Sequence, residues 1–269
     1  MSLLWGLNRE VNERLKHLEL PFNRFGVDKY GVSRRHLRPG IVALTWLYRN
    51  YFDVHVHGIH HVPGRGRAML VGNHSGGVAL DAAVVATSMF WEKDPPRLAQ
   101  GMAEKFMAKV PFFSSWTHRW GQFTGLPEHA EQLLRDDRLL MVFPEGARGT
   151  QKLYSERHSL VRFGTGFVRL ALKTKSPIVP LAFLGGGEAI PTIYNSKRLG
   201  KILGAPYVPV TPYGLTLPLP VRLDVIYSEP MVFAGHGNEE DEVIFGYVDE
   251  VKARVASLIE EGRRLRRQR

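Results

Sequence analysis

The fold of this chain is constrained most by a series of short, strongly apolar segments that alternate with longer helical patterns. Five of these segments are predicted to be buried strands: AMLVGN (68–73), RLAQGM (97–102), LLMVFPEG (139–146), SPIVPLAFLG (176–185) and VRLDVIYS (221–228). The earlier strands are separated by helical patterns near residues 78–91, 103–116, 127–136 and 159–174. Alternating strands and helices predict an α/β fold with a mostly parallel central sheet flanked by helices.

Both ends of the chain are predicted to form helices outside this alternation. Residues 2–20 form an amphipathic helix, because apolar residues recur at helical spacing at Leu4, Leu7, Val11, Leu15 and Leu18. Residues from about 239 to 269 form a second helix, which finishes in EEGRRLRRQR. We therefore divide the chain into N-terminal amphipathic, membrane-associating helices (1–50) and one α/β domain (51–269) that includes the basic C-terminal helix.

The composition is that of a folded globular protein, and it excludes several kinds of chemistry. The 269 residues are 44% apolar and 23% charged, which suffices for one large domain with its own core. There is no cysteine, so disulfides, thiolate metal sites and a cysteine nucleophile are excluded. No signal peptide is expected, because charge interrupts the place of its apolar core at Arg9, Glu10, Glu13 and Arg14.

Charge and hydropathy leave several partners open, because a basic chain can bind nucleic acid, an anionic membrane or an acidic small substrate. The apolar run GIVALTWLY (40–48) is well short of the ~20 residues that a spanning helix needs, and it is either a buried helix or an interfacial segment. The net charge is +10, and five arginines follow Glu261 with no acidic residue among them. Such a run is either a solvated helix end or a site of attraction to anionic lipid headgroups.

The stretch NHSGGVALD (73–81) places a histidine at the carboxyl end of a predicted buried strand, where open α/β sheets bind ligands. The following helix would carry Asp81 in its first turns, within reach of the His74 imidazole. An aspartate on one ring nitrogen fixes the tautomer, so that the other nitrogen can accept a proton from a hydroxyl. From this stretch alone, a helix-capping aspartate and an unrelated loop histidine explain the pattern equally well.

The stretch VFPEGARGT (142–150) also follows a predicted strand. Gly146 and Gly149 favour a tight loop, and Arg148 supplies a planar cation that suits a phosphate or a carboxylate. Glu145 is placed to orient that arginine or to accept a hydrogen bond from a substrate hydroxyl. A strand followed by such a turn also occurs as plain structure, so the signal is weak when taken alone.

Taken together and in this order, the two stretches resemble the glycerolipid acyltransferase superfamily, typified by lysophosphatidate acyltransferases. The resemblance covers roughly residues 50–230. It extends to RWGQFTG (119–125), at the position of the middle family motif, and to IVPLAFLG (178–185), at the position of the last one.

The resemblance implies a role for each matched residue. His74 is the general base and Asp81 its partner, while Glu145, Gly146, Arg148 and Gly121 fall on motifs that bind the acceptor. The implied reaction moves a fatty acyl group from an acyl-thioester, either acyl-CoA or acyl carrier protein, to a hydroxyl of a lysophospholipid or a mono- or diacylglycerol. Backbone N–H groups near Gly76, Gly77 or Gly146 are candidates to stabilise the oxyanion. No cofactor and no metal are implied.

The motifs depart from the commonest family pattern in three places. Six residues, instead of four, separate His74 from Asp81, and Ala79 stands where a proline is usual. Thr124 and Gly125 follow Phe123, where an arginine is often found. The longer histidine–aspartate spacing resembles a branch whose members include acyltransferases that act on neutral glycerolipids, so the acceptor is either phosphorylated or neutral.

Other functions and partners were weighed against acyl transfer. A non-catalytic lipid-binding protein of the same fold has no need of a base and its partner, and a hydrolase would use His74 to activate water. The histidines of HVHGIHH (55–61) lack nearby carboxylates apart from Asp53, which argues against a metal site. Charge alone does not support nucleic-acid binding. The expected partners are a lipid acceptor, a thioester donor and an anionic membrane surface.

The expected location is the cytoplasmic face of a membrane, in peripheral, monotopic association. The aliphatic face of residues 2–20 and the run 40–48 are the segments expected to dock there. The proline-rich segment APYVPVTPYGLTLPLPVRL (205–223) cannot be a regular helix, and it either walls an acyl groove or packs as a loop over the core. The acyl chain length and the oligomeric state stay open.

Overall fold

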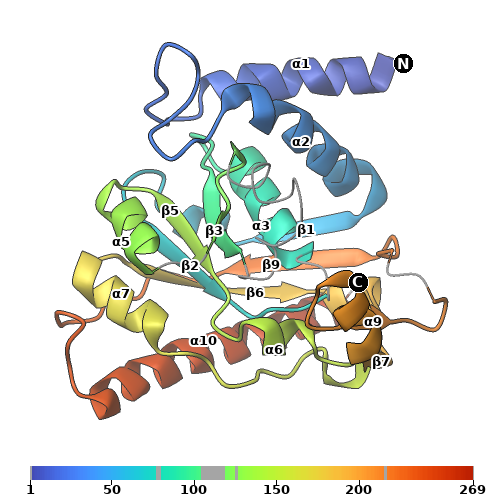
Figure 1. The fold of residues 1–269 in the computed structure, drawn as a ribbon, viewed down its shortest axis with the longest axis vertical. Helices are drawn as coiled ribbons and strands as arrows, with labels where there is room; N and C mark the ends of the chain where they lie inside the picture. The colour runs from blue at the N-terminus through green and yellow to red at the C-terminus, as the bar shows by residue number, and fades with distance from the viewer. Residues whose placement is uncertain (1, 77–79, 104–118, 125–126, 215–216, 269) are drawn as a thin grey trace.

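A computed structural model describes residues 2–76, 80–103, 119–124, 127–214 and 217–268, and a seven-stranded sheet runs through the middle of the described chain (Figure 1). The strand order across this sheet is β1 (Asp53–His57), β9 (Arg222–Tyr227), β6 (Ile178–Leu184), β2 (Ala68–Gly72), β5 (Leu139–Val142), β3 (Ala99–Ala103) and β4 (Phe123–Thr124). All five predicted strands are confirmed, with ends that differ by at most four residues.

The sheet is mostly parallel, as predicted, with one reversal. Strand β2 pairs in parallel with β5 and β6, and β3 pairs in parallel with β5 and β4. Strand β9 runs antiparallel to β6, with Leu184 opposite Asp224, and β1 then pairs in parallel with β9 at the sheet edge. The connection from β6 to β9 therefore leaves and re-enters the sheet at the same edge.

Helices cover both faces of the sheet, which explains why its central strands are apolar throughout. Successive side chains of a strand point to opposite faces. Met69 and Val71 pack under α5 (Pro127–Arg135), α7 (Gly166–Thr174) and α10 (Asp241–Arg267). Leu70 packs with Val84, Val85 and Met89 of α3 (Leu80–Trp91). With both faces covered, no polar alternation is left in β2, where all five residues are buried.

Two predicted helices need comment. The helix expected at 159–174 begins only at Gly166, because the backbone N–H of Val161 donates instead to the carboxylate of Glu145, at 2.9 Å. A 3-10 turn at Tyr154–Glu156 precedes residues 159–165, which form neither helix nor strand. The helix expected at 103–116 falls almost entirely outside the described residues.

The N-terminal helices form a further layer above α3 (Figure 1). Helix α1 (Ser2–Lys16) packs its apolar face, Leu7, Val11 and Leu15, against Leu37 of α2 (Arg34–Trp46) and Phe90 of α3. The expectation that this face docks on a bilayer is therefore wrong, because these side chains are already buried in the protein. Burying each of them away from water contributes roughly 1.5–3 kcal/mol to folding, so this face already has its apolar partner within the protein.

The apolar run 40–48 lies in the last turns of α2 and the π-helical turn Leu47–Tyr51 that follows. Its buried residues are Gly40, Thr45 and Tyr48, whereas Trp46 is exposed. Gly40 lies against the ring of Trp120, where a Cβ would approach Cζ2 to 1.7 Å. The run therefore contributes to the packing between layers through these residues, while Ala43 and Trp46 are exposed. No helix within the described ranges is long and apolar enough to cross a membrane.

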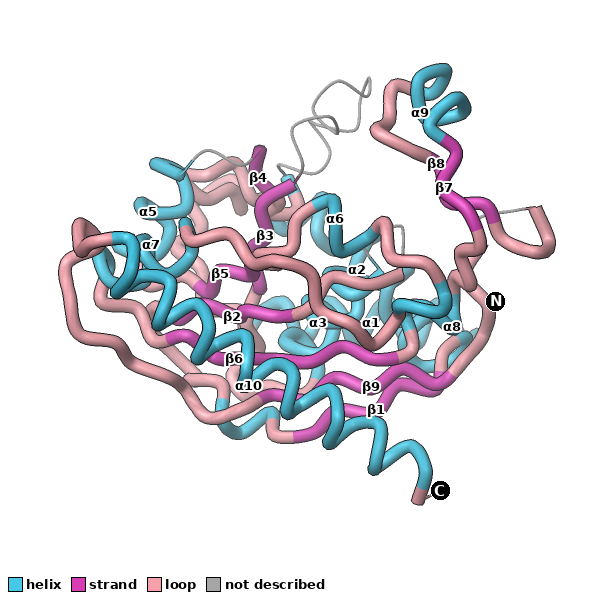
Figure 2. The backbone as a smooth tube through the Cα atoms, turned by 90° about the horizontal axis from the view of Figure 1, so that it is seen from below, coloured by secondary structure: helices cyan, strands magenta, loops and turns pink. Residues whose placement is uncertain are grey.

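The connection from β6 to β9 contains an excursion that stands out from the body of the molecule (Figure 2). After the short helix α8 (Gly186–Ala189), strand β7 (Tyr194–Ser196) leads into α9 (Lys197–Leu203), and β8 (Val208–Val210) returns antiparallel to β7. As predicted for the proline-rich segment 205–223, its described residues contain no helix. We call residues 191–220 the excursion.

The C-terminal helix α10 spans Asp241–Arg267, close to the predicted 239–269. Its apolar stripe, which includes Ile244, Val251 and Leu258, packs on the sheet. Two of the arginines near its end are engaged within the protein: Arg263 pairs with Glu260, and Arg266 lies 3.6 Å from Asp224. Arg264 and Arg267 are exposed.

Candidate active site

The site lies where β2, β5 and β6 end. Since β2 pairs in parallel with both β5 and β6, the carboxyl ends of the three strands lie at one edge of the sheet. The chain continues from β2 into Asn73 and His74, and from β5 into Phe143, Pro144 and Glu145. Pro144 has no N–H to donate to a neighbouring strand, which accounts for β5 ending before the predicted residue 146. The predicted motifs therefore lie side by side, although 71 residues separate His74 from Glu145.

His74 and Asp81 form a hydrogen-bonded pair. The Nδ1 atom of His74 lies 2.6 Å from Oδ2 of Asp81, whose side chain is fully buried in the first turn of α3. The same Oδ2 accepts the N–H of Ser75 at 2.8 Å, and Oδ1 accepts the N–H of Ala82 at 2.8 Å. The carboxylate is thus fixed on both sides. Asp81 therefore contacts the ring of His74, and the alternative of a capping aspartate unrelated to the histidine is wrong.

The environment of His74 sets its pKa. Burial of the ring lowers the pKa of His74, but the charge of Asp81 and its hydrogen bond to Nδ1 raise it, and the net shift is upward. The ring stacks on Phe143, with 4.6 Å between centroids and 12° between planes. Since 13% of the His74 side chain stays exposed and Nδ1 is engaged by Asp81, Nε2 is the nitrogen available for an incoming hydroxyl.

Glu145 is buried and positions the backbone of His74. Its side chain is fully buried, and Oε1 accepts the backbone N–H of His74 at 2.8 Å. Oε2 accepts the N–H of Val161 at 2.9 Å and pairs with Nζ of Lys152 at 3.0 Å. Lys152 also donates to the Ser159 carbonyl at 3.0 Å. The sequence assigned Glu145 to acceptor binding, but the structure engages both of its oxygens within the protein, where they fix the backbone of His74.

Three glycines allow the loops of the site to approach each other. A Cβ on Gly149 would lie 2.6 Å from Cβ of His74 and 2.8 Å from Cβ of Glu145. Gly76 has φ +91° and lies against Gly186, where an added Cβ would be 3.1 Å from Cα of Gly186. Gly186 in turn lies against Ser75. The histidine loop is therefore packed between the loops that follow β5 and β6.

Of the residues that follow Glu145 in its motif, 146–150, only Arg148 is exposed. Gly146 has φ +56° and precedes the single turn α6 (Ala147–Thr150), and its N–H donates to the Phe143 carbonyl at 3.0 Å. That N–H closes the turn, which weakens Gly146 as an oxyanion donor. Arg148 is exposed, and its Nη2 donates to the Arg162 carbonyl at 3.3 Å. Its guanidinium is the cation that the motif presents at the surface.

The middle motif is not joined to this cluster within the described chain. Gly121 is buried with φ +78° and lies against Leu98 and Gln100 at the start of β3. Its nearest neighbours therefore belong to the β3 side of the sheet, and they give it a packing role there. Gly77, the second oxyanion candidate, lies outside the described residues.

Sequence reasoning missed three residues that hold the site. The Asn73 side chain bridges β2 to β6, with Nδ2 donating to the Phe183 carbonyl at 2.9 Å and Oδ1 accepting the Phe183 N–H at 2.8 Å. Phe143 and Lys152 are the others, and they contact His74 and Glu145 as described above. A polar residue directly after an apolar strand is a usable signal for Asn73. Nothing in the local pattern distinguishes Lys152 from a surface lysine.

The histidines of residues 55–61 lie on and after the edge strand β1. His55 pairs with Asp53 at 3.0 Å and His57 lies 3.4 Å from Asp224, while His60 and His61 contact each other. Among the residues that the structure describes, no group of three or more histidines and carboxylates is arranged to hold a metal ion.

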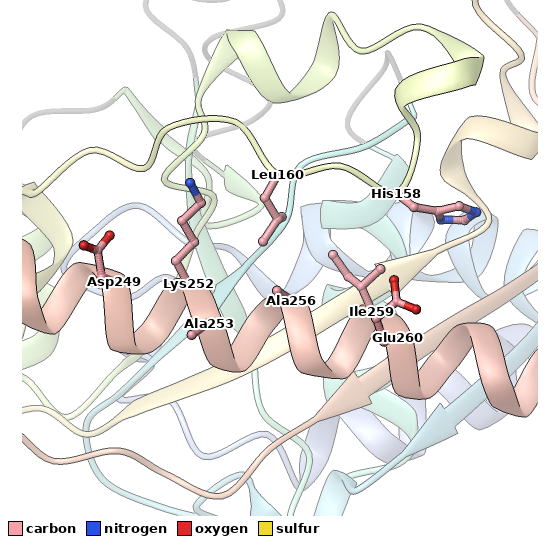
Figure 3. A pocket seen from close by; sticks show the side chains of 8 residues that line it. All are labelled: His158, Leu160, Asp249, Lys252, Ala253, Ala256, Ile259 and Glu260. Atoms are coloured by element: carbon pink, nitrogen blue, oxygen red, sulfur yellow. The ribbon is translucent and has the colours of Figure 1, made fainter.

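A separate hollow of about 390 Å³ lies between α10 and the loop before α7 (Figure 3). Leu160, Ala253, Ala256 and Ile259 form its apolar part, and charged residues surround them. In Figure 3 the side chains of Asp249, Lys252 and Glu260 stand along one helix. The hollow contains neither His74 nor Asp81.

The fold and the site together define an α/β protein with a histidine–aspartate pair at the carboxyl edge of a mostly parallel sheet. The family model described as Acyltransferase matches residues 53–184. An uncharacterized protein of Mycobacterium tuberculosis is 30% identical over 248 residues, which cover 87% of this chain and 69% of the relative. The chain belongs to the Acyltransferase family, within the glycerolipid acyltransferase superfamily that its motifs resemble.

Two further relatives carry functional descriptions. The human "DGAT1/2-independent enzyme synthesizing storage lipids" is 25% identical over 221 residues, which cover 78% of this chain and 62% of the relative. The crystal structure of the 1-acyl-sn-glycerophosphate acyltransferase PlsC from Thermotoga maritima matches with a TM-score of 0.57 and 20% identity, over 86% of this chain and 79% of that one. The second match shows that the two proteins share a fold.

Proposed function

We propose that the protein transfers a fatty acyl group from an acyl-thioester to the hydroxyl of a glycerolipid, with His74 as general base and Asp81 as its positioning partner. The observation that carries this proposal is the 2.6 Å hydrogen bond from His74 Nδ1 to a fully buried Asp81. It holds the ring in the tautomer in which Nε2 is the proton acceptor. The family membership supports the same chemistry, and residues 51–269 are the domain proposed to perform it.

The proposed reaction needs no covalent enzyme intermediate. Nε2 of His74 takes the proton of the acceptor hydroxyl while the hydroxyl oxygen attacks the thioester carbonyl carbon. The new C–O bond forms, the C–S bond breaks, and the leaving thiolate takes the proton back from the imidazolium. Asp81 stabilises that imidazolium through its negative charge. Backbone N–H groups at Gly76 or Gly77 are proposed to stabilise the oxyanion.

The proposed acceptor class is a lysophospholipid or a mono- or diacylglycerol. The exposed Arg148 is suited to the phosphate of a lysophospholipid, because its fork of N–H donors matches phosphate oxygens. The human relative is described by storage-lipid synthesis, which favours a neutral acceptor. The proposed donors are acyl-CoA and acyl carrier protein, with no cofactor. The proposed location is the cytoplasmic face of a membrane, in peripheral association.

The test uses purified wild type and His74→Ala with a labelled acyl-thioester. Each donor, acyl-CoA or acyl carrier protein, is offered with lysophosphatidate, monoacylglycerol, diacylglycerol or a long-chain alcohol. His129→Ala is the matched control, because it removes an exposed histidine of α5 that lies outside the stretches 73–81 and 142–150. Acceptor-dependent product that is lost only in His74→Ala supports the proposal and names the acceptor.

Two results would contradict it. Consumption of the thioester without an acylated acceptor would make the protein a hydrolase. Lipid binding without turnover of either donor would make it a non-catalytic lipid-binding protein.

A further inference from the structure

The excursion, residues 191–220, is where exposed apolar side chains concentrate. Seven of the 14 large hydrophobic residues that are exposed within the described chain lie in its 27 residues 193–219: Ile193, Tyr194, Leu199, Ile202, Tyr213, Leu217 and Leu219. Ile202 is 78% exposed and Leu217 is 66% exposed. Scattered exposed hydrophobics are normal on a soluble protein, but such a concentration on one projecting segment marks an interaction surface.

The charges on the same segment are all of one sign. No aspartate or glutamate occurs between Glu188 and Asp224, whereas Lys197, Arg198 and Lys201 lie on or beside the exposed part of α9. The structure gives these three cations no ion pair with a carboxylate of the described chain. Apolar side chains that alternate with unpaired cations complement a surface whose interior is apolar and whose boundary is anionic.

The fold of the excursion keeps these side chains outward. The Ser196 hydroxyl caps α9 by accepting the N–H of Leu199, and Gly204, with φ +70°, ends the helix. Gly200 lies directly on the chain at Tyr207, where a Cβ would approach within 2.6 Å of Cα. The face of α9 that carries Gly200 packs against the chain at Tyr207, just before β8. The side chain of Ile202 is left exposed to solvent.

The excursion is also tied to the site. The Tyr207 hydroxyl donates to the Thr150 hydroxyl, and Nδ2 of Asn195 donates to the Gln151 carbonyl at 2.6 Å. Thr150 belongs to α6, the turn whose Gly149 packs against His74. A surface that binds the excursion is therefore held at a fixed position relative to the histidine.

We propose that the excursion is the part of the protein that docks on an anionic membrane, with Leu199 and Ile202 entering the interface and Lys197 and Lys201 contacting the headgroups. Tyr194 and Tyr213 have the amphipathic rings that favour the headgroup level. This inference rests on the proposed function in one respect, that the acceptor is a membrane lipid. It replaces the N-terminal helix α1, whose apolar face is buried, as the docking element.

The test measures binding of the full chain to phosphatidylcholine vesicles with and without phosphatidylglycerol, by co-sedimentation. Lys197→Gln/Lys201→Gln removes two cations, each worth about fivefold near an anionic surface, so the partition coefficient should fall about 25-fold on the anionic vesicles only. Arg264→Gln/Arg267→Gln is the control that removes two exposed cations of α10, and it should bind as wild type does.

The apolar contribution is tested in the same assay. Leu199→Ser/Ile202→Ser should reduce binding by about tenfold or more on both kinds of vesicle, because two aliphatic side chains no longer enter the interface. Trp5→Ser/Phe25→Ser, which changes exposed residues near the N-terminus, should leave binding unchanged. All excursion variants should keep wild-type turnover on a short-chain, water-soluble acceptor.

The outcomes are distinguishable. Wild type that binds neither vesicle, or loss of binding only in the N-terminal control, would overturn the inference. Unchanged vesicle binding together with a raised KM for acyl carrier protein would make the surface a docking site for that acidic protein, which also overturns it. Co-sedimentation measures vesicle binding without turnover. The binding result can therefore be interpreted even if the proposed acyl transfer is not observed.

Discussion

The buried Glu145–Lys152 pair predicts a large and specific loss of stability when its cation is removed. In Lys152→Met, the Glu145 carboxylate keeps the N–H groups of His74 and Val161 but loses its only charge partner in the described structure. The lysine side chain is 5% exposed and the glutamate 0%, so water cannot replace the ammonium. Removing one member of such a pair costs about 3–5 kcal/mol, a large part of the 5–15 kcal/mol that stabilises a typical domain.

The measurement is equilibrium unfolding in urea, read by tryptophan fluorescence and by circular dichroism. Lys173→Met is the matched control, because Lys173 pairs with Glu131 at the surface and its side chain is 55% exposed. An exposed pair is worth about 0–1 kcal/mol, so the same substitution should have little effect there. Glu145→Gln/Lys152→Met should be less destabilised than Lys152→Met, by about 1–3 kcal/mol, because no unpaired charge remains.

Two results would refute this reasoning. A loss below about 1 kcal/mol in Lys152→Met would mean that water or another group reaches Glu145. A double variant that loses at least as much as the sum of the two single variants would mean that the pair is not coupled as the structure has it.

Three further predictions concern the site. His74→Ala should lower kcat by about 10²–10⁴-fold in a protein that still folds, checked by turnover and by a melting curve that shows a cooperative transition. In wild type, kcat/KM should fall as pH falls through the raised pKa of His74, since only the neutral ring accepts a proton. In Asp81→Asn, kcat should drop and this acid limb should move to lower pH, because the carboxylate that raises the pKa of His74 is gone while burial of the ring still lowers it. Gly149→Ala should lose activity and about 1–3 kcal/mol of stability, because its methyl would meet Cβ of His74 at 2.6 Å; a folded, fully active variant would refute the close packing of these loops.

Sequence reasoning recovers the sheet well because the central strands are buried on both faces. Their continuous apolar runs, such as Ile178–Leu184, are visible without any knowledge of the neighbours. The pairing order and the reversal at β9 were not predictable in this way, since an apolar run has no mark of direction. The predicted start of α7 was too early because a distant carboxylate, Glu145, accepts the N–H of Val161, and the segment before Gly166 stays outside the helix.

In the candidate site, too, some residues could be assigned from the sequence and others only from the fold. The stretch with His74 and Asp81 left a helix-capping aspartate as an equal alternative, and the family resemblance implied the pair; the fold then places Nδ1 of His74 2.6 Å from Oδ2 of Asp81. The acceptor role assigned to Glu145 came from the motif alone, while its burial depends on Lys152 and the loop at Val161, which only the folded chain brings together. Likewise, the amphipathic pattern of α1 is real, but whether such a face meets protein or lipid depends on a neighbour that the pattern does not contain.

The antiparallel pairing of β6 and β9 has a consequence for how this protein can vary. Because Leu184 and Asp224 stand opposite each other in the ladder, the chain between them begins and ends at adjacent points of one rim. A segment inserted there crosses no face of the sheet, and doubling its length adds only about 0.6 kcal/mol of closure entropy. The segment between β6 and β9 can thus differ in length without a change in the order of the strands. Residues of this segment that make no contact with the site can change in number without altering the strand order, whereas Gly186, Asn195 and Tyr207 connect it to the site.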